Sequence, residues 1–487
     1  MNFMNRLVLI ISVLFPAFVA AANFPVKREI LPNGLTVLLY PNRQAPTVSC
    51  RLFYVTGAVH EVPGHSGLSH ILEHELFKGT EKVGVKDSVK DAEFMRKEDS
   101  LQALIRPLRL SGDTAQAAKL TAQHDSILNE QRKYFVKDEL WSAYQEAGGT
   151  GLNAFTTDLM TAYFVTLPKN RIELFLWLES DRMQNAVLRE FYSERSVVRE
   201  ERRMRTDDRP TGRYYETLNS LIYEAFPYRI PVIGWPTDIE NLTREEAAAH
   251  YLKYYKPRNA ILVLAGDIDT TQAMALVKKY FAQIPTGEAF PPITIRDPEQ
   301  AGEKRLVVWR PDAPNILNIV FKTPAVGDSS LYALDIIEGV LNGRSGRLYK
   351  RLVEEKKLAV SVSASNSPNK YVSEFSIGVN LQPDADPAAV ENIVWEELNK
   401  LKTEAVSAHD FQKVKNNSYA SLIRNMTDME NVATMLAWYE MFGDYHLFLD
   451  WADHLNSVTP AQVQNTAQKF FTHKNSTVGM LLKGEEK

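Results

Sequence analysis

Cysteine is almost absent from this chain of 487 residues, in which Cys50 is the only one. The chain therefore cannot form an internal disulfide, and any metal site must be built from His, Asp or Glu. A long Lys/Arg block is also absent, and the formal charge of −4 makes nucleic acid an unsuitable partner. Because 45% of the residues are apolar, wholesale disorder is excluded and substantial cores can form.

Long hydrophobic runs are also missing, except at the N-terminus. Residues 1–6 carry one basic side chain, residues 7–20 are apolar with one interruption at Pro16, and small residues follow. This layout is typical of a secretory signal peptide, predicted over residues 1–22, whose cleavage leaves no membrane span. An uncleaved anchor is the alternative. We expect an exported protein, located in the periplasm of a Gram-negative bacterium or secreted.

The rest of the chain repeats one order of elements. In each half, the apolar patterns predict two strands, a helix, further strands and helices, and a last strand. A Pro- and Gly-rich stretch at 285–304 separates the halves and is the predicted linker. We therefore predict an α+β fold of two homologous α/β-sandwich domains, each a mixed sheet flanked by helices. Their expected bounds are 23–284 and 305–487.

Two stretches of the first half have their own patterns. Residues 152–167 are predicted to form one strand. Residues 85–146 are polar and helical in pattern, with a turn at Ser111-Gly112-Asp113, so we expect a helical hairpin inserted into the first domain. The pattern leaves open whether this insertion has a role or is a tolerated surface feature.

One motif carries the expected chemistry. His70, Glu73 and His74 lie in a predicted helix over 66–78, in the order H-x-x-E-H. Residues four apart share a helix face, so the two imidazoles can bind one cation, and Glu73 lies within reach of a water on that cation. The alternative is a surface helix with two solvated histidines, but the apolar neighbours of the motif argue against it.

A catalytic zinc usually needs a third protein ligand. In a predicted helix over 190–205, Glu194 and Glu201 lie two turns apart on a stripe that also carries two valines, and the opposite side carries arginines that we expect to face solvent. Glu201 could ligate the metal, and Glu194 could orient a histidine or the water. The spacing alone leaves open that Glu200 and Glu201 only form ion pairs with neighbouring arginines.

Three sequence blocks resemble the pitrilysin/insulinase family of zinc peptidases, the inverzincins. They are the motif helix at 67–80, the stretch GGTGLNAFT at 148–156 and the stretch ERSVVREE at 194–201. The resemblance covers nearly the whole mature chain. Its length and two-half layout are most similar to the processing-peptidase-like branch, here as a bacterial exported member.

The resemblance implies a role for each motif residue. His70, His74 and Glu201 are the implied ligands of one zinc per chain, Glu73 the general base on a zinc-bound water, and Glu194 the supporting acid. Glu200, the neighbour of Glu201, points about 100° away from the Glu194 stripe on a helix. The resemblance also places three residues on an edge strand that pairs with the substrate backbone: Asn153, Ala154 and Phe155.

The expected function is therefore that of an exported zinc endopeptidase that hydrolyses peptides or unfolded polypeptide segments. The alternative is a non-catalytic subunit that binds peptides or scaffolds a peptidase complex.

The second half departs from the pattern. Aligning its first helix with the motif places Leu334 opposite His70 and Glu338 opposite His74, so a second metal site is not expected. The resemblance implies an Arg and, seven residues later, a Tyr that contact substrate, whereas this chain has valines there, Val353 and Val360. We expect a homologous partner subunit that supplies the Arg/Tyr pair, in a heterodimer. The alternative is a homodimer that uses other residues, such as Lys356 or Tyr371.

Overall fold

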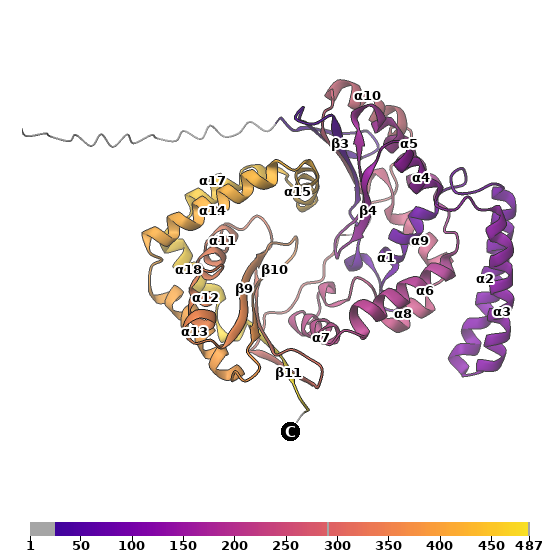
Figure 1. Ribbon diagram of the computed structural model, residues 1–487. Coiled ribbons are helices and arrows are strands. Elements are labelled where there is room, and N and C mark those ends of the chain that lie inside the picture. The colour runs from indigo at the N-terminus through magenta and orange to yellow at the C-terminus, as the bar shows by residue number, and fades with distance from the viewer. Residues whose placement is uncertain (1–24, 290–291, 486–487) are drawn as a thin grey trace, which may run out of the picture.

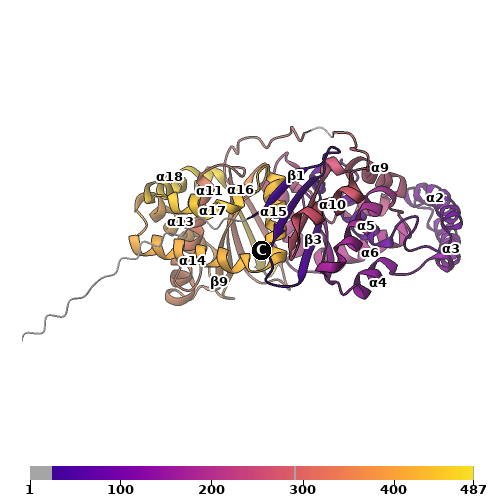
Figure 2. The same cartoon turned by 90° about the horizontal axis from the view of Figure 1, so that it is seen from above.

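The computed structural model describes residues 25–289 and 292–485. Two mixed sheets, each flanked by helices, lie side by side and form the two halves of the molecule (Figures 1 and 2). The predicted α+β fold of two α/β sandwiches is confirmed. The predicted signal peptide lies outside the described residues.

The first sheet has the strand order β1-β2-β6-β3-β5-β4. Strands β2 and β6 run parallel, and the other neighbours are antiparallel. Strand β4 lies at one edge, which leaves one side of its backbone available for a further strand. The bounds are β1 Lys27–Ile30, β2 Thr36–Pro41, β3 Thr47–Tyr54, β4 Thr150–Thr156, β5 Thr161–Pro168 and β6 Ala260–Gly266.

The single strand predicted over 152–167 is wrong, because a turn divides it into β4 and β5. The Thr157 hydroxyl accepts hydrogen bonds from the backbone N–H groups of Leu159 and Met160. A threonine that bonds to the backbone two or three residues ahead closes a tight turn. The alternating apolar pattern continues through this turn, so it gave no sign of the break.

Most helices of the first half lie on the face of its sheet that points away from the second half (Figure 1). The helix over Gly212–Ile222 instead packs in the core between the halves, and the two long helices between Ser88 and Gln131 project from the body. The bounds are α1 Leu68–Glu75, α2 Ser88–Ser111, α3 Thr114–Gln131, α4 Glu139–Glu146, α5 Ile172–Asn185, α6 Phe191–Arg202, α7 Gly212–Ile222, α8 Pro236–Asn241, α9 Arg244–Tyr254 and α10 Thr270–Phe281. Helices α7, α8 and α10 have no counterpart among the predicted elements.

Helices α2 and α3 form an antiparallel hairpin that projects from the first half (Figure 1). Gly112, with φ of 80°, ends α2 in the left-handed conformation, and the Asp113 carboxylate caps α3. Two buried ion pairs attach the hairpin to the body: Arg189 with Asp91 at 2.7 Å and Arg244 with Glu98 at 2.5 Å.

The second sheet repeats the topology of the first. Its order is β7-β11-β8-β10-β9, with β7 and β11 parallel and the other neighbours antiparallel. Without β1, the first sheet has the same order and directions, which is the arrangement that a duplication produces. The bounds are β7 Lys304–Arg310, β8 Ile316–Thr323, β9 Ala359–Ser367, β10 Ser373–Leu381 and β11 Ser476–Lys483.

The helices of the second half follow the same plan. Helix α11 follows β8, as α1 follows the equivalent strand β3, and α14 is the second helix after β10, as α6 is after β5. The bounds are α11 Ser330–Leu341, α12 Arg347–Tyr349, α13 Pro387–Thr403, α14 Ala408–Met426, α15 Met429–Phe442, α16 His446–Leu449, α17 Trp451–Ser457 and α18 Pro460–Phe470.

Three hydrophobic cores hold the molecule together. One lies within each half, and a third joins the halves, because α15 packs on β3 and β6 of the first sheet. Arg28 pairs with Glu440 at 2.7 Å across the same junction. In the described part of the predicted linker, residues 285–289 and 292–303, there is no helix or strand before β7 begins, and Figure 2 shows this segment running between the halves. No helix in the described part of the chain is long and apolar enough to cross a membrane.

Candidate active site

Helices α1 and α6 bring His70, His74 and Glu201 together. One ligand atom from each of the three lies within 4.8 Å of the others. Oε2 of Glu201 is 3.7 Å from Nε2 of His70 and 3.4 Å from Nε2 of His74. The three atoms therefore converge on one point, although 126 residues separate His74 from Glu201 in the sequence.

The start of α1 is fixed by a buried carboxylate. Gly67 has φ of 91° and precedes the helix, and Oε2 and Oε1 of Glu61 accept hydrogen bonds from the N–H groups of Gly67 and Ser69. A carboxylate at this end satisfies backbone donors that have no partner in the helix. Ile71 and Leu72 are fully buried in the first core and hold α1 against the sheet. His70 and His74 then share the face that meets α6.

Helix α6 is oriented differently from the prediction that its arginines face solvent. Val197 is 46% exposed, whereas Arg202 is fully buried. The Arg202 guanidinium pairs with Glu216 at 2.7 Å and donates to the carbonyl of Gly234. Arg195 is also buried and donates to the carbonyl of Leu242. Ion pairs and carbonyl acceptors supplied by distant segments make burial of these arginines possible, and the pattern of the helix alone does not show them.

Of the two adjacent glutamates, only Glu201 meets the histidines. The Glu200 side chain is 60% exposed and pairs with Arg203 at 2.9 Å. Glu201 is largely buried, and its other oxygen, Oε1, is 2.7 Å from Arg205. The hydrogen bond with His74 lowers the pKa of Glu201, and the charges of His70 and Arg205 add to this effect. Glu201 is therefore ionised, and it contributes a negatively charged carboxylate oxygen to the triad.

Glu194 lies behind His74. Its Oε2 is 3.4 Å from Nδ1 of His74, and its Oε1 is 2.6 Å from Nζ of Lys78. Burial opposes charge on His74, but the hydrogen bonds to Glu194 and Glu201 raise its pKa to about 9. The pKa of His70 is lowered to about 4 by burial and by the charge of His74. Glu194 holds the ring so that Nε2 of His74 points into the triad.

Glu73 faces the same space from α1. The Thr156 hydroxyl, at the end of β4, donates a hydrogen bond of 2.6 Å to Oε2 of Glu73. Burial raises the pKa of Glu73, and this hydrogen bond acts against the rise. A carboxylate with a raised pKa is suited to accept and return a proton. Thr156 was not among the predicted site residues, because its contact with Glu73 depends on how β4 packs on α1.

Asn153, Ala154 and Phe155 lie on the edge strand β4, at different levels of exposure. Asn153 is exposed, and its Oδ1 accepts from the N–H of Ala154. Ala154 is buried. Phe155 is half-buried and packs edge-on against Phe53, with ring centroids 6.3 Å apart. Of the three side chains, Asn153 is therefore the most accessible to a ligand beside the strand.

The triad fits a catalytic zinc. Two imidazole nitrogens and one carboxylate form a three-ligand set that leaves a coordination position for water. Nε2 of His70 and Nε2 of His74 both face Oε2 of Glu201, and Glu201 and Glu194 supply negative charge on both sides of His74. Within residues 25–289 and 292–485, no other group of three or more His, Cys, Asp or Glu side chains converges in this way.

Val353 and Val360 occupy the two positions at which the family resemblance implies an Arg and a Tyr, so neither position offers a polar side chain. Val353 packs against the second core, and Val360 on β9 is 59% exposed. The nearby Arg351 is bound to Glu396 and Glu397, each at 2.9 Å. Its guanidinium is therefore occupied on the outer side of the second half.

Comparison with known proteins gives consistent matches. The family model described as insulinase (peptidase family M16) matches residues 36–95, and the peptidase M16 inactive domain matches residues 241–418. Zinc protease PqqE of Helicobacter pylori is 26% identical over 482 residues, which is 97% of this chain and 96% of that protein. The crystal structure of a protease from Helicobacter pylori superposes with a TM-score of 0.79 at 25% identity, over 94% of this chain and 99% of the other.

A more distant structure shares the fold. The periplasmic protease PqqL from Escherichia coli has a TM-score of 0.72 at 16% identity, over 94% of this chain but only 48% of the PqqL chain. Together with the family models and the relative that matches end to end, these findings identify the chain. It belongs to the insulinase family, peptidase family M16.

Proposed function

We propose that this chain is a zinc-dependent endopeptidase that hydrolyses peptides or unfolded polypeptide segments. The observation that carries the proposal is the convergence of His70, His74 and Glu201 beside Glu73, at the edge of an open sheet. The relative that matches over 97% of this chain is named a zinc protease, which supports the same activity.

Each residue of the site has a separate role in the proposed reaction. His70, His74 and Glu201 hold the metal, which polarises water and the scissile carbonyl when bound. Glu73 takes a proton from the attacking water and returns it to the leaving amine. Thr156 holds the Glu73 carboxylate in place through the 2.6 Å hydrogen bond.

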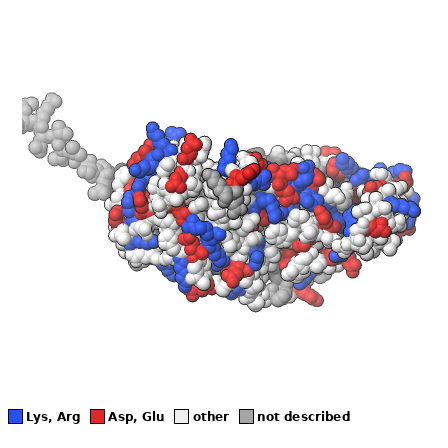
Figure 3. Space-filling model, turned by 90° about the horizontal axis from the view of Figure 1, so that it is seen from below, with Lys and Arg blue, Asp and Glu red and all other residues white. Residues whose placement is uncertain are grey.

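The edge strand β4 is the proposed binding site for the substrate backbone. An extended peptide can add to β4 as a further strand, because the outer side of β4 faces no neighbouring strand in the sheet order. Asn153, the exposed polar residue on this strand, is placed to contact the peptide. On the face of the molecule in Figure 3, basic and acidic side chains are intermixed.

We further propose that the chain is exported and periplasmic. The layout of residues 1–22 supports export, and the structural relative PqqL is described as a periplasmic protease.

The proposed partner is a homologous subunit that carries the missing Arg/Tyr pair. The PqqL chain is about twice the length that this chain covers, so it has room for two such units in one polypeptide. A heterodimer would supply the second unit in trans, and a homodimer is the alternative. To test this, the purified chain is assayed alone and then with a candidate partner. Full activity of the lone chain, with no gain on mixing, would refute the heterodimer.

A second candidate function is that of a non-catalytic peptide-binding or scaffolding subunit. The match to the peptidase M16 inactive domain over residues 241–418 is the observation in its favour. That match lies mainly in the second half, whereas the complete triad lies in the first. Digestion of a peptide mixture separates the two candidates. Zinc-loaded chain, with its partner if one is found, should cleave peptides, and Glu73→Gln should reduce the rate by at least about 100-fold, the scale of general-base catalysis. Equal rates for both would exclude Glu73 as the base.

A further inference from the structure

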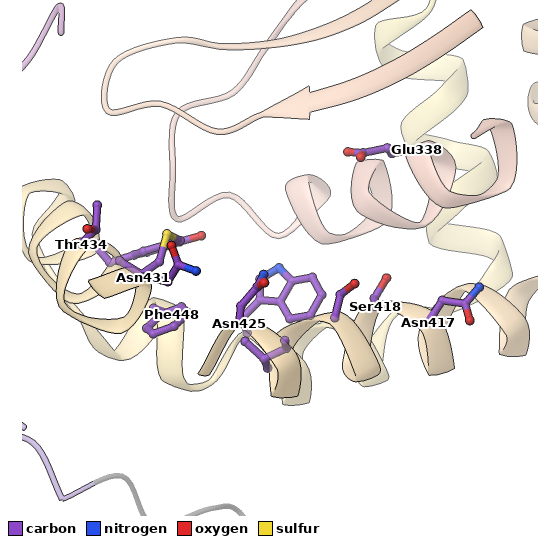
Figure 4. A pocket seen from close by; sticks show the side chains of 12 residues that line it. Glu338, Asn417, Ser418, Asn425, Asn431, Thr434 and Phe448 are labelled. Carbon is purple, nitrogen blue, oxygen red and sulfur yellow. The ribbon is translucent and has the colours of Figure 1, made fainter. Parts of the chain in front are cut away.

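A cavity of about 580 Å³ lies in the second half, between the helices equivalent to those that carry the triad. Glu338 on α11 and five residues of α14, four of them polar, line it, and α15, α16 and α17 contribute the rest. Figure 4 shows Glu338 across an open space from Asn417, Ser418 and Asn425 on α14. The second half has therefore kept a pocket where the first half has its metal site, and the two share no residue.

One carboxylate lines this pocket, and a second lies behind its lining. Glu338 lines it, and Asp335 lies one turn earlier on α11. Asn366 on β9 connects them, because its backbone N–H donates to Glu338 at 2.9 Å and its Nδ2 donates to Asp335 at 2.7 Å. Trp451, which also lines the pocket, donates its indole N–H to Asp335 at 2.9 Å. This arrangement mirrors the contact of Thr156 on β4 with Glu73 on α1.

Neither carboxylate has a counter-charge. Among the described residues, no Lys, Arg or His forms an ion pair with Asp335 or Glu338. Oδ1 of Asn366 is buried beside them, and no described residue donates a hydrogen bond to it. Burial raises the pKa of Asp335 to about 6, and burial and the charge of Asp335 raise the pKa of Glu338. The site thus has an unfilled acceptor and two carboxyl groups whose ionised forms lack a compensating positive charge, and a cation with N–H donors would supply both the donor and the charge.

The rest of the lining indicates which kind of cation fits. Three aromatic side chains, Tyr439, Phe448 and Trp451, face the pocket together with Leu422 and Met435. Aromatic faces attract organic cations, and apolar side chains bury an alkyl arm. Glu338 is the one carboxylate that lines the pocket, and among the described residues no group of three or more His, Cys, Asp or Glu converges here, so the lining lacks the carboxylate cluster that divalent cations favour.

We propose that this pocket binds an organic cation, an ammonium or guanidinium group on a short apolar arm, with Glu338 as the direct partner of the charge. The same chemistry has two sources: a Lys or Arg side chain of a peptide, and a free amine. The proposal does not depend on the peptidase activity, because the pocket is separate from the triad.

Calorimetric titration of the full chain tests the proposal and separates the sources. The background variant Glu73→Gln, which is expected to slow cleavage at least about 100-fold, keeps the peptides intact during the titration. Agmatine and cadaverine represent the free amines. Acetyl-Ala-Lys-Ala-amide represents the basic side chain, and acetyl-Ala-Gln-Ala-amide is its neutral control. We expect at least one of the cationic probes to bind and the neutral peptide to bind at least tenfold more weakly. Binding of the amines alone, the peptide alone or both then identifies the source.

Variants locate the binding. Glu338→Gln should weaken binding at least tenfold, whereas Glu404→Gln, which removes an exposed charge from the same half, should leave it unchanged. Ser421→Phe, an exposed position that lines the cavity, should fill the pocket and abolish binding without changing Tm. Failure of all cationic probes to bind, equal binding of the neutral peptide, or undiminished binding by Glu338→Gln and Ser421→Phe would overturn the proposal.

Discussion

His74 has a carboxylate at each ring nitrogen, and this arrangement decides what the ring can do. Glu194 meets Nδ1 and Glu201 meets Nε2, both at 3.4 Å. In the absence of a metal, these carboxylates hold a proton on the ring and raise its pKa to about 9. A metal ion must displace that proton from the Nε2 side, so metal binding should weaken as the pH falls.

The first prediction concerns zinc content. Because the triad is the proposed set of protein ligands, His70→Ala, His74→Ala and Glu201→Gln should lose the metal, measured by mass spectrometry of the purified protein. Glu73→Gln should keep about one zinc per chain, since Glu73 is the proposed base and not a ligand.

The matched control is Glu200→Gln, on the same helix but 60% exposed and paired with Arg203. It should keep its zinc. Normal zinc content in a folded Glu201→Gln variant would exclude Glu201 as a ligand.

The second prediction concerns Thr156, which holds the Glu73 carboxylate. Thr156→Val keeps the shape of the side chain and removes the donor. A hydrogen bond to a charged group contributes about 1.5–3 kcal/mol, so the rate of peptide cleavage should fall about tenfold or more. Thr156→Ser restores the hydroxyl and should restore the rate. Zinc content and Tm should stay unchanged in both, and a slow Thr156→Ser variant would show that the methyl group matters instead of the hydrogen bond.

At the scale of the element, α6 depends on its buried arginine. Arg202 is fully buried between Glu216, Asp207 and the carbonyl of Gly234, so it ties α6 to the start of α7 and to the chain before α8. Removing one partner of a buried ion pair leaves the other uncompensated. Helix α6 carries Glu194 and Glu201, so this tie also sets the position of both carboxylates.

The third prediction follows for Arg202→Met. The free energy of unfolding should fall by about 3–5 kcal/mol, measured by urea denaturation of the full chain. Arg203→Met, the neighbouring position with a half-exposed side chain, should change it by less than about 0.5 kcal/mol. Equal effects of the two substitutions would contradict the proposed role of Arg202.

At the scale of the molecule, strand addition at β4 requires an extended substrate. The fourth prediction is that a compact disulfide-bonded protein resists cleavage until it is reduced and unfolded, because a folded chain cannot supply a free strand. Electrophoresis of the native and reduced forms of one substrate measures the difference. Equal rates on both forms would be inconsistent with the edge-strand model.

The junction between the halves contains a titrating group. Asp158 lies in the turn between β4 and β5, and burial, with the charge of Glu374 on β10 adding to it, raises the pKa of Asp158 to about 7. In the folded state Asp158 therefore keeps a proton that it releases in the unfolded chain once the pH exceeds the ordinary pKa of the carboxyl group, near 4. Each unit of pKa difference between the folded and unfolded states contributes up to about 1.4 kcal/mol to the free energy of unfolding. This contribution is lost as the pH rises from about 4 to 7.

The fifth prediction is that Asp158→Asn makes the slope of Tm between pH 5 and 7 more positive than in the unsubstituted chain, because the amide does not titrate. Buried histidines such as His60 and His250, whose pKa values are lowered, contribute slopes of the opposite sign equally in both proteins. Calorimetric scans of both proteins across this range provide the measurement. Asp312→Asn, at an exposed acid outside the junction, is the control and should leave the slope unchanged. An identical slope in Asp158→Asn would exclude Asp158 as the source.

The sequence alone determined the features that depend on short-range geometry. The helical period places His70 and His74 on one face, and the repeated order of strands and helices predicts two similar sheets. The glycine-containing turn at Ser111-Gly112-Asp113 separates α2 from α3 as expected. These features follow from backbone geometry within a few residues, so the local pattern is sufficient to predict them.

Only the tertiary structure decided how distant segments meet. It selected Glu201 over Glu200 through the packing of α6 on α1, placed Thr156 on Glu73, and buried arginines that the pattern of α6 assigned to solvent. It also divided the predicted strand at Thr157, where one side-chain hydroxyl closes a turn. Some of these outcomes depend on a partner residue that is distant in the sequence, and others depend on a hydroxyl contact that hydrophobic periodicity does not encode. The sequence could therefore predict the residue types of the site but not all of its contacts.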